Sequence, residues 1–345
     1  GSHHLFSSEP SVLLSDHGDA LPVENFISMD QPKHDLTRRA VQPVVAPRNL
    51  AEMEGLIRSR VQAILDELPV GEAFNWVDRV SINLTTQMLA TLFDFPFEDR
   101  AKLTFWSDIA AATPELTGGD VAEEERLAAM QECMETFTRL WHERAQDNSE
   151  GMDLIRLLQR DPNTATMVER PMEFLGTMLL LIIVGNDTTR NSITGGVLAL
   201  NENPSEYEKL RANRELIPSM VSEIIRWQTP LMHMRRTAKQ DVEFRGKTIR
   251  AGDKVVMWYL SGNRDDRVIE NADHFIIDRP NPRQHMAFGF GIHRCMGNRL
   301  AEMQLRILWE EIMQRFSFVE VIGSPRRVKS NFVRGYEQLP VVLHR

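Results

Sequence analysis

The sequence of 345 residues is poor in cysteine and contains only Cys133 and Cys295. Two cysteines give no disulfide framework, so a reducing cytoplasm is the natural compartment. Cys133 lies in a helical pattern and is expected to be packed in the core. An excess of positive charge is also missing: the formal net charge is −9 at pH 7. This charge argues against nucleic acid or an anionic membrane as the main partner, because both attract basic surfaces.

The sequence has no apolar run long enough to span a bilayer. The longest run, Phe174 to Val184, is too short and ends at a polar Asn-Asp pair. It predicts a buried helix and no integral membrane anchor. No repeat or low-complexity block divides the chain, and 42% of its residues are hydrophobic. These features predict one large domain over residues 5–345, while residues 1–4 resemble the remnant of an expression tag.

The hydrophobic periodicity predicts a mainly α fold with minor β structure. Up to about residue 240 apolar residues return every three or four positions, which is typical of helices. The expected helices include Leu50–Leu68, Trp76–Phe93, Arg126–Arg144, Pro171–Asn201 and Arg299–Phe316. Alternating runs predict a small antiparallel sheet over Asp241–Trp258 and strand structure over Phe332–Leu343. Pro and Gly predict a mobile connection over Thr113–Asp120.

The most informative segment, Phe288 to Gly297, reads Phe-Gly-Phe-Gly-Ile-His-Arg-Cys-Met-Gly and precedes a helical pattern. A thiolate at a helix N-terminus is stabilised by the dipole and by unpaired backbone N–H groups. Glycine lets the backbone turn tightly and approach a flat macrocycle. The segment therefore indicates thiolate ligation of haem by Cys295. The alternative is that Cys295 is a small buried hydrophobe in a glycine-rich turn.

The pattern Phe-x-x-Gly-x-x-x-Cys-x-Gly resembles the haem-binding loop of the cytochrome P-450 haem-thiolate monooxygenases. The resemblance implies a helical body with small antiparallel sheets. It also implies haem b with Cys295 as the iron ligand, O2 as co-substrate, and Phe288, Gly289 and Gly297 beside the haem. Members of this family carry a helix and strands before the equivalent of Leu5–Ser8. The chain is therefore expected to be N-terminally incomplete.

A second motif, Val184-Gly185-Asn186-Asp187-Thr188-Thr189, interrupts the apolar run. A hydroxyl that bonds the carbonyl four residues earlier can open a helix and leave a groove. The motif resembles the family's oxygen-activation motif, which implies that Asp187 relays protons and Thr188 steadies oxygen. Val184 stands where the family usually has Ala or Gly, so it is expected to narrow the space above the haem. The alternative is an ordinary helix bend.

Glu223 and Arg226 are three residues apart and share one helix face. They resemble the family's Glu-x-x-Arg motif, and Arg279 matches its later arginine partner. The resemblance implies a structural network that fastens the segment carrying the cysteine loop. On its own, such a pair is common on solvated helices.

A haem has two propionates that require cations or imidazole donors. By resemblance this clamp consists of His34, Arg38, Arg236 and His293, acting through charge-assisted hydrogen bonds. Any one of these residues alone is more often a surface charge.

The positions that the family uses to line its substrate pocket are apolar here: Leu180, Ile183, Val184, Leu231, Met232, Phe332 and Val333. A deep pocket with such a lining favours hydrocarbon-like ligands, which bind mainly by burial. The alternative is that several of these residues belong only to the core.

Longer sequence segments resemble the soluble bacterial terminal hydroxylases of alkanes and fatty acids. Examples are Gly-Asn-Asp-Thr-Thr-Arg-Asn-Ser and Ser-Asn-Phe-Val-Arg-Gly-Tyr. The resemblance implies insertion of one oxygen atom from O2 into a terminal C–H bond of a medium-chain substrate. It also implies electrons from a 2Fe–2S ferredoxin that is reduced by a flavin-containing reductase. The chain has no flavin or iron–sulfur motif, so both partners are expected to be separate proteins.

The basic residues Arg38, Arg39, Arg294 and Arg299 are expected near the thiolate side, where they could meet an acidic ferredoxin. Three other functions remain open from the sequence. They are hydroxylation of terpenoids or other bulky apolar molecules, a peroxide-driven haem-thiolate enzyme, and a non-catalytic haem-thiolate sensor or carrier.

Overall fold

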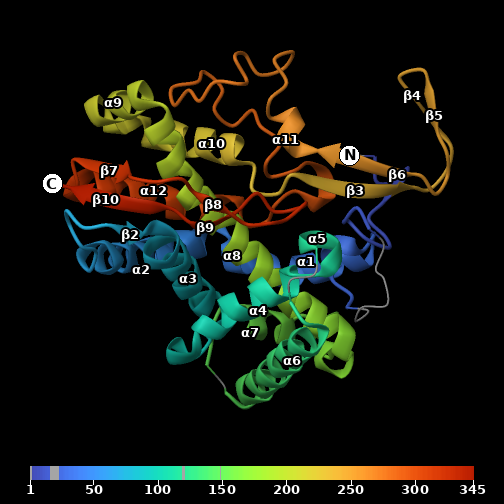
Figure 1. Cartoon of the computed structure of the whole chain (residues 1–345). Coiled ribbons are helices and arrows are strands. Elements are labelled where there is room, and N and C mark those ends of the chain that lie inside the picture. Colours follow the sequence, from blue (N-terminus) through green and yellow to red (C-terminus); the bar gives the residue numbers. More distant parts are fainter. Residues whose placement is uncertain (1, 16–22, 119–120, 148) are drawn as a thin grey trace.

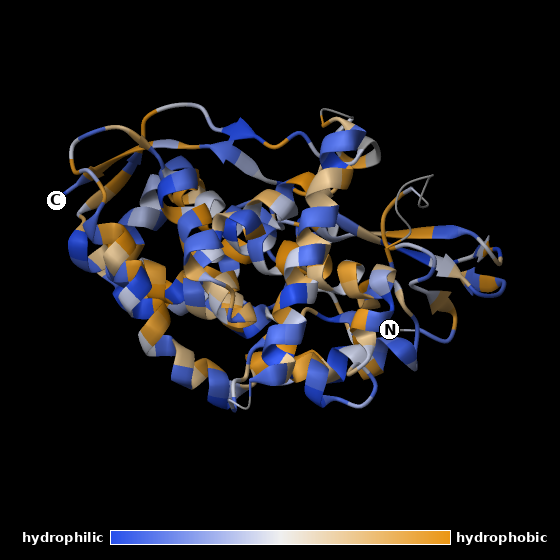
Figure 2. Cartoon of the chain, turned by 90° about the horizontal axis from the view of Figure 1, so that it is seen from below, coloured by the Kyte–Doolittle hydropathy of each residue, from blue (hydrophilic) through white to orange (hydrophobic). Residues whose placement is uncertain are grey.

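The computed structural model describes residues 2–15, 23–118, 121–147 and 149–345. The fold is mainly helical with small antiparallel sheets, as predicted. Helix α8 (Pro171–Glu202) crosses the centre of the molecule, and the other elements pack around it (Figure 1). In Figure 2 the outer helices carry both hydrophilic and hydrophobic segments, as expected of amphipathic helices that cover a core.

The remaining helices agree with the predicted ranges to within a few residues where a range was predicted. They are α1 (Lys33–Val41), α2 (Pro47–Asp66), α3 (Asn83–Phe93), α4 (Ala101–Ala111), α5 (Pro114–Thr117), α6 (Glu123–Gln146), α7 (Leu154–Arg160), α9 (Pro204–Ala212), α10 (Ile217–Gln228), α11 (Tyr259–Gly262) and α12 (Asn298–Arg315). A π-helical segment, η3 (Val77–Ile82), leads directly into α3, so the predicted helix Trp76–Phe93 is continuous but not α-helical throughout.

Two of the four sheets that the described residues form are three-stranded. One pairs β1 (Phe6–Ser7), β3 (His233–Ala238) and β6 (Lys254–Trp258), and the other pairs β2 (Phe74–Asn75), β10 (Pro340–His344) and β7 (Phe318–Val321). The two-stranded sheets are the projecting hairpin β4 (Val242–Phe244) with β5 (Lys247–Ile249), and β8 (Arg326–Arg327) with β9 (Tyr336–Gln338) (Figure 1).

The prediction of one sheet over Asp241–Trp258 is wrong in its pairing. Strand β6 does not join the β4–β5 hairpin but pairs with β3, with Met234 opposite Met257. Strand β3 lies in the part of the chain that was expected to be mostly helical. Its residues His233, Met234 and Arg235 are all buried. A strand covered on both faces lacks the alternating pattern by which a half-exposed strand is recognised.

The predicted connection Thr113–Asp120 lies between α4 and α6, and the part that the structure describes includes the short helix α5. The Thr117 N–H donates to the Thr113 carbonyl (2.9 Å), and the Asn331 N–H donates to the Leu116 carbonyl (3.0 Å). Gly119 and Asp120 lie outside the described residues.

Among the described residues, α8 is one helix whose length and apolarity would suit a membrane span, but 72% of its apolar window is buried inside the fold. The apolar run Phe174–Val184 is therefore part of a buried core helix, as predicted. A Cβ at Gly195 would lie 2.3 Å from the Gln228 side-chain oxygen. Glycine at this position allows α10 to pack closely against α8.

Candidate active site

One face of α8 is uncovered although most of the helix is buried. Leu180, Ile183 and Thr188 are partly exposed, and Val184 is 37% exposed. Their spacing of three or four residues places them on one side of the helix. The structure therefore brings three predicted substrate residues onto the same face as the predicted catalytic threonine.

The Thr188 hydroxyl donates a hydrogen bond to the Val184 carbonyl, at 3.0 Å. This is the bond to the carbonyl four residues earlier that the sequence suggested. Helix α8 is continuous from Pro171 to Glu202, so this hydrogen bond lies within an unbroken helix. Val184 is exposed and Thr188 partly exposed, so both residues lie at the surface of that helix.

Asp187 is buried and contacts Ser107 and Arg190, so it does not lie on the uncovered face that carries Thr188. Its side chain is 3% exposed, and its Oδ1 accepts a hydrogen bond from the Ser107 hydroxyl of α4 (3.2 Å). Arg190 Nη2 lies 3.0 Å from the same oxygen and donates to Asp108 Oδ1 at 2.8 Å. Burial raises the pKa of Asp187 to about 6, against the opposing effect of Arg190. The carboxyl is therefore able to exchange a proton near neutral pH.

Ser107, Asp108 and Arg190 were missed in the sequence. Arg190 lies three residues after Asp187, and the spacing argument used for Glu223 and Arg226 would have found it. The two α4 residues carry no comparable local signal, because their contact with α8 is tertiary.

The raised pKa of Asp187 predicts a pH dependence of stability. The unfolded carboxyl ionises near pH 4 and the folded one near pH 6, so the stability that Asp187 contributes is present below pH 4 and is lost as the pH rises to about 6. Because asparagine does not titrate, the stability of wild type relative to Asp187→Asn should fall by roughly 1 to 3 kcal/mol between pH 4 and pH 7. Urea unfolding of both proteins at several pH values measures this difference. A constant difference across that range would contradict the prediction.

The loop before α12 holds Cys295 in a defined backbone. Gly289 (φ +65°) and Gly291 (φ +75°) have left-handed conformations that favour glycine. The Cys295 N–H donates to the Phe288 carbonyl at 2.8 Å, which closes the loop. The side chain of Cys295 is exposed.

Backbone N–H groups of Gly297 and Asn298 donate to the Cys295 sulfur. Surrounding protein atoms raise the pKa of this thiol, whereas these donors and the charges of Arg38 and Arg294 lower it, and the net result lies above the ordinary value. A bound metal ion deprotonates a coordinating thiol outright. The loop thus presents an accessible sulfur whose thiolate form is already hydrogen-bonded.

The three glycines of the loop have different roles. Backbone conformation accounts for Gly289 and Gly291, whereas Gly297 has φ −86° and does not need glycine for its backbone. A Cβ at Gly297 would meet no atom within 4 Å. Gly297 therefore leaves open space beside Cys295 that a flat group could occupy.

The four predicted propionate-binding residues lie together. The rings of His34 and His293 are 4.0 Å apart between centroids, and the charges of Arg38 and Arg236 act on both histidines. Within the described ranges Arg38 and Arg236 have no ion pair, and burial lowers the pKa of both. His34 Nε2 is buried without a hydrogen-bond partner. This uncompensated positive site fits an acidic group such as the two propionates of haem.

His293 has an additional neighbour that the sequence did not indicate. The Ser8 hydroxyl lies 2.8 Å from His293 Nε2. This contact joins the first residues of the chain to the cysteine loop.

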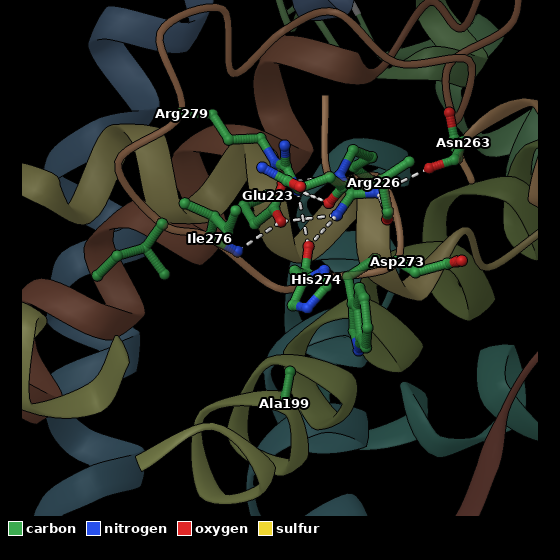
Figure 3. Close-up of polar contacts among 12 residues, drawn as sticks. Ala199, Glu223, Arg226, Asn263, Asp273, His274, Ile276 and Arg279 are labelled. Carbon is green, nitrogen blue, oxygen red and sulfur yellow. Dashed lines mark hydrogen bonds and ion pairs between the residues drawn. The ribbon is translucent and has the colours of Figure 1, made fainter. Parts of the chain in front are cut away.

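Figure 3 shows that Glu223, Arg226 and Arg279 form one network. Arg226 binds both carboxylate oxygens of Glu223 at 2.7 Å, and Arg279 Nε lies 3.0 Å from Glu223 Oε2. The two arginines also donate to backbone carbonyls between Asn263 and His274. The network therefore ties α10 to the segment before the cysteine loop, in the arrangement that the sequence predicted.

The other predicted substrate residues form a separate group. Leu231 and Val333 make an isolated β-bridge, and the Met232 N–H donates to the Phe332 carbonyl at 3.0 Å. Val333 is only 8% exposed, whereas Leu231, Met232 and Phe332 are half-buried. The structure thus places the candidates on two parts of the chain, one on α8 and one where residues 231–232 contact residues 332–333.

A surface cavity of about 1030 Å³ is lined by Cys295 together with Arg38, Arg39, Arg294 and Arg299. Within the part of the chain that the structure describes, none of these four arginines has an ion pair. Arg283, Arg306 and one acid, Glu302, also line it. The thiolate side is therefore strongly basic although the whole chain is acidic.

The family model of cytochrome P-450 matches residues 120–334, more than half of the chain. The structure of cytochrome P-450-153 from Novosphingobium aromaticivorans is 45% identical, superposes with a TM-score of 0.91, and aligns over 99% of this chain and 86% of its own. Linalool 8-monooxygenase of Pseudomonas putida is 36% identical over 99% of this chain and 83% of its own length. The methyl-branched lipid omega-hydroxylase of Mycobacterium bovis is 31% identical over 98% of this chain and 79% of its own length.

The chain belongs to the cytochrome P-450 family. It is accordingly a haem-dependent monooxygenase, which uses haem b with a cysteine thiolate ligand and O2 as the oxidant.

Proposed function

We propose that this monooxygenase inserts one oxygen atom from O2 into the terminal C–H bond of medium-chain alkanes or fatty acids. The observation that carries the proposal is the uncovered α8 face, where the exposed or partly exposed residues Leu180, Ile183, Val184 and Thr188 are uncharged, whereas Asp187 is buried. An apolar face of this kind binds hydrocarbon by burial and offers no anchor for a charged head group. The proposal is also supported by the 45% identity to cytochrome P-450-153 and by the sequence's resemblance to terminal hydroxylases.

In this proposal Cys295 is the thiolate ligand, in a loop completed by Phe288, Gly289 and Gly297. The cluster of His34, Arg38, Arg236 and His293 holds the propionates, and Glu223, Arg226 and Arg279 brace the loop. When bound, the haem supplies the activation of O2.

The remaining residues position the substrate and control protons. Asp187 takes up a proton and passes it toward the Thr188 hydroxyl, whose bond to the Val184 carbonyl fixes its direction. Leu180, Ile183, Val184, Leu231, Met232, Phe332 and Val333 contact the substrate. The Val184 side chain narrows the open space so that a slender chain end fits better than a branched or cyclic group.

The basic cavity around Cys295 is the docking surface for the electron donor in this proposal. Arg38, Arg39, Arg294 and Arg299 attract an acidic 2Fe–2S ferredoxin, which a flavin-containing reductase supplies with electrons. The proposal places the enzyme in the cytoplasm, as one domain over residues 5–345.

A hydroxylase of terpenoids or other bulky apolar molecules is the second candidate. It is favoured by the 36% identity to linalool 8-monooxygenase, which this chain matches over 99% of its length.

Optical titration of the ferric haem protein separates the two candidates. Octane should shift the spectrum toward high spin at a lower concentration than linalool does. Octanoate is compared in the same way to test the tolerance for a carboxylate. Saturation by linalool with no response to octane would contradict the terminal-hydroxylase proposal and support the second candidate.

A further inference from the structure

Arg190 is shared between two carboxylates on different helices. A single nitrogen, Nη2, lies 3.0 Å from Asp187 Oδ1 on α8 and 2.8 Å from Asp108 Oδ1 on α4. Asp187 is buried, whereas the Asp108 side chain is 49% exposed. The guanidinium therefore joins the interior acid to an acid at the surface.

The geometry of this pair is weaker than that of the Glu223–Arg226 pair. Arg226 donates hydrogen bonds to both oxygens of Glu223, whereas Arg190 approaches Asp187 to 3.0 Å without a hydrogen bond between them among the described residues. Arg190 Nε is buried without a hydrogen-bond partner. A guanidinium held at one point has freedom to move between its two partners, whereas a two-point pair is fixed.

The second oxygen of Asp187 is free for proton exchange. The Ser107 hydroxyl donates to Oδ1, which is also the Asp187 oxygen nearest to Arg190, and Oδ2 accepts no hydrogen bond from the residues that the structure describes. Oδ2 is also not among the fully buried unpaired atoms. Oδ2 is therefore the oxygen at which the Asp187 carboxyl can take up and release a proton.

Arg190 cannot carry that proton itself, because a guanidinium does not deprotonate in proteins. The chain Asp108–Arg190–Asp187 is consequently not a proton wire. What it can control is the position of the Asp187 carboxylate and the strength with which a positive charge holds it in the ionised form.

We propose that Asp108 is a positioning residue for proton delivery. It competes with Asp187 for Arg190 and so weakens the attraction between Arg190 and the Asp187 carboxylate. Asp187 can then take up and release protons during turnover. This inference rests on the proposed role of Asp187 but not on the identity of the substrate. The charged groups that act on Asp187 are Arg190 on its own helix and Asp108 on α4, and Ser107 adds one hydroxyl. Without the Asp108 charge, Arg190 would pair with Asp187 alone and hold it ionised.

The test compares Asp108→Asn, which removes the charge at nearly constant size, with Asp108→Glu, which keeps it. Asp99→Asn is the matched control, because Asp99 is an exposed acid just before α4. Each haem-loaded protein is assayed with ferredoxin, reductase and NADH. The readouts are kcat, KM, the product formed per NADH, the solvent deuterium isotope effect and the pH profile of kcat.

Asp108→Asn should lower kcat about three- to tenfold, a small part of the roughly 10²- to 10⁴-fold that a group transferring the proton itself contributes, because Asp108 acts only through Arg190. KM and the substrate-induced spin shift should stay unchanged. The isotope effect should rise, the yield of product per NADH should fall, and the pH profile should move to lower pH. Asp108→Glu should restore most of the wild-type behaviour, and Asp99→Asn should match wild type.

The proposal would be overturned if Asp108→Asn and Asp99→Asn gave the same product yield per NADH, the same isotope effect and the same pH profile. Equal loss of kcat in Asp108→Glu and Asp108→Asn would also overturn it, because that result describes a structural contact. The same comparison is made with linalool if octane is not turned over. A failure of the terminal-hydroxylase proposal is thereby distinguished from a failure of this one.

Discussion

Replacing Cys295 by histidine should remove the thiolate-type Soret band from the spectrum of the ferrous carbon monoxide complex and abolish substrate hydroxylation. Histidine can still bind iron, but it is a weaker electron donor than a thiolate and does not favour cleavage of the O–O bond in the same way. The change affects the ligand atom directly, so we expect the loss of turnover to be complete within the detection limit. The measurement is the carbon monoxide difference spectrum of purified protein with a determined haem content.

Cys133→Ala is the matched control for this experiment. Cys133 is fully buried in α6, and burial raises the pKa of its thiol, so it is poorly suited to bind a metal as thiolate. This variant should keep the thiolate-type band at the cost of a small cavity, worth about 1 kcal/mol of stability. A thiolate-type band that persists in Cys295→His would contradict the assignment of the ligand.

Replacing Glu223 by alanine should have the largest effect on stability. Glu223 is completely buried and holds Arg226, which is 1% exposed, and Arg279. Its removal leaves two cations without a carboxylate, and breaking a buried pair in this way costs about 3 to 5 kcal/mol. Because the same network anchors the segment before the cysteine loop, we also expect poor retention of haem. Urea unfolding and the ratio of Soret to protein absorbance measure the two effects.

The control for this variant is Glu52→Ala. Glu52 pairs with Arg48 on the surface of α2, where the two side chains are 65% and 89% exposed. An exposed pair of this kind contributes at most about 1 kcal/mol. Similar losses in Glu223→Ala and Glu52→Ala would show that the buried network does not brace the fold.

Much of the site could be predicted because its signals are local in the sequence. The cysteine loop depends on glycines and a helix start within ten residues, and the core helix α8 depends on a single apolar run. The association of Arg279 with Glu223 was available only from family resemblance, since 56 residues separate them.

The features that could not be predicted depend on tertiary burial. Strand β3 has three consecutive buried residues, so its sequence shows no alternation of apolar and polar residues. It pairs with β6, and the whole β4–β5 hairpin lies between these two strands in the sequence. Ser107 and Asp108 lie on a different helix from Asp187, and nothing in their local sequence indicates that α4 packs its polar residues against α8. The different roles of Gly289 and Gly297 likewise required the backbone angles.

The most direct test of the proposed chemistry is the product distribution from octane, with the haem-loaded enzyme, a 2Fe–2S ferredoxin, its reductase and NADH under ¹⁸O2. We expect 1-octanol as the dominant product, labelled with one oxygen atom from ¹⁸O2. Turnover of octane mainly to 2-, 3- or 4-octanol would contradict terminal oxidation, and unlabelled alcohol would contradict monooxygenation by O2.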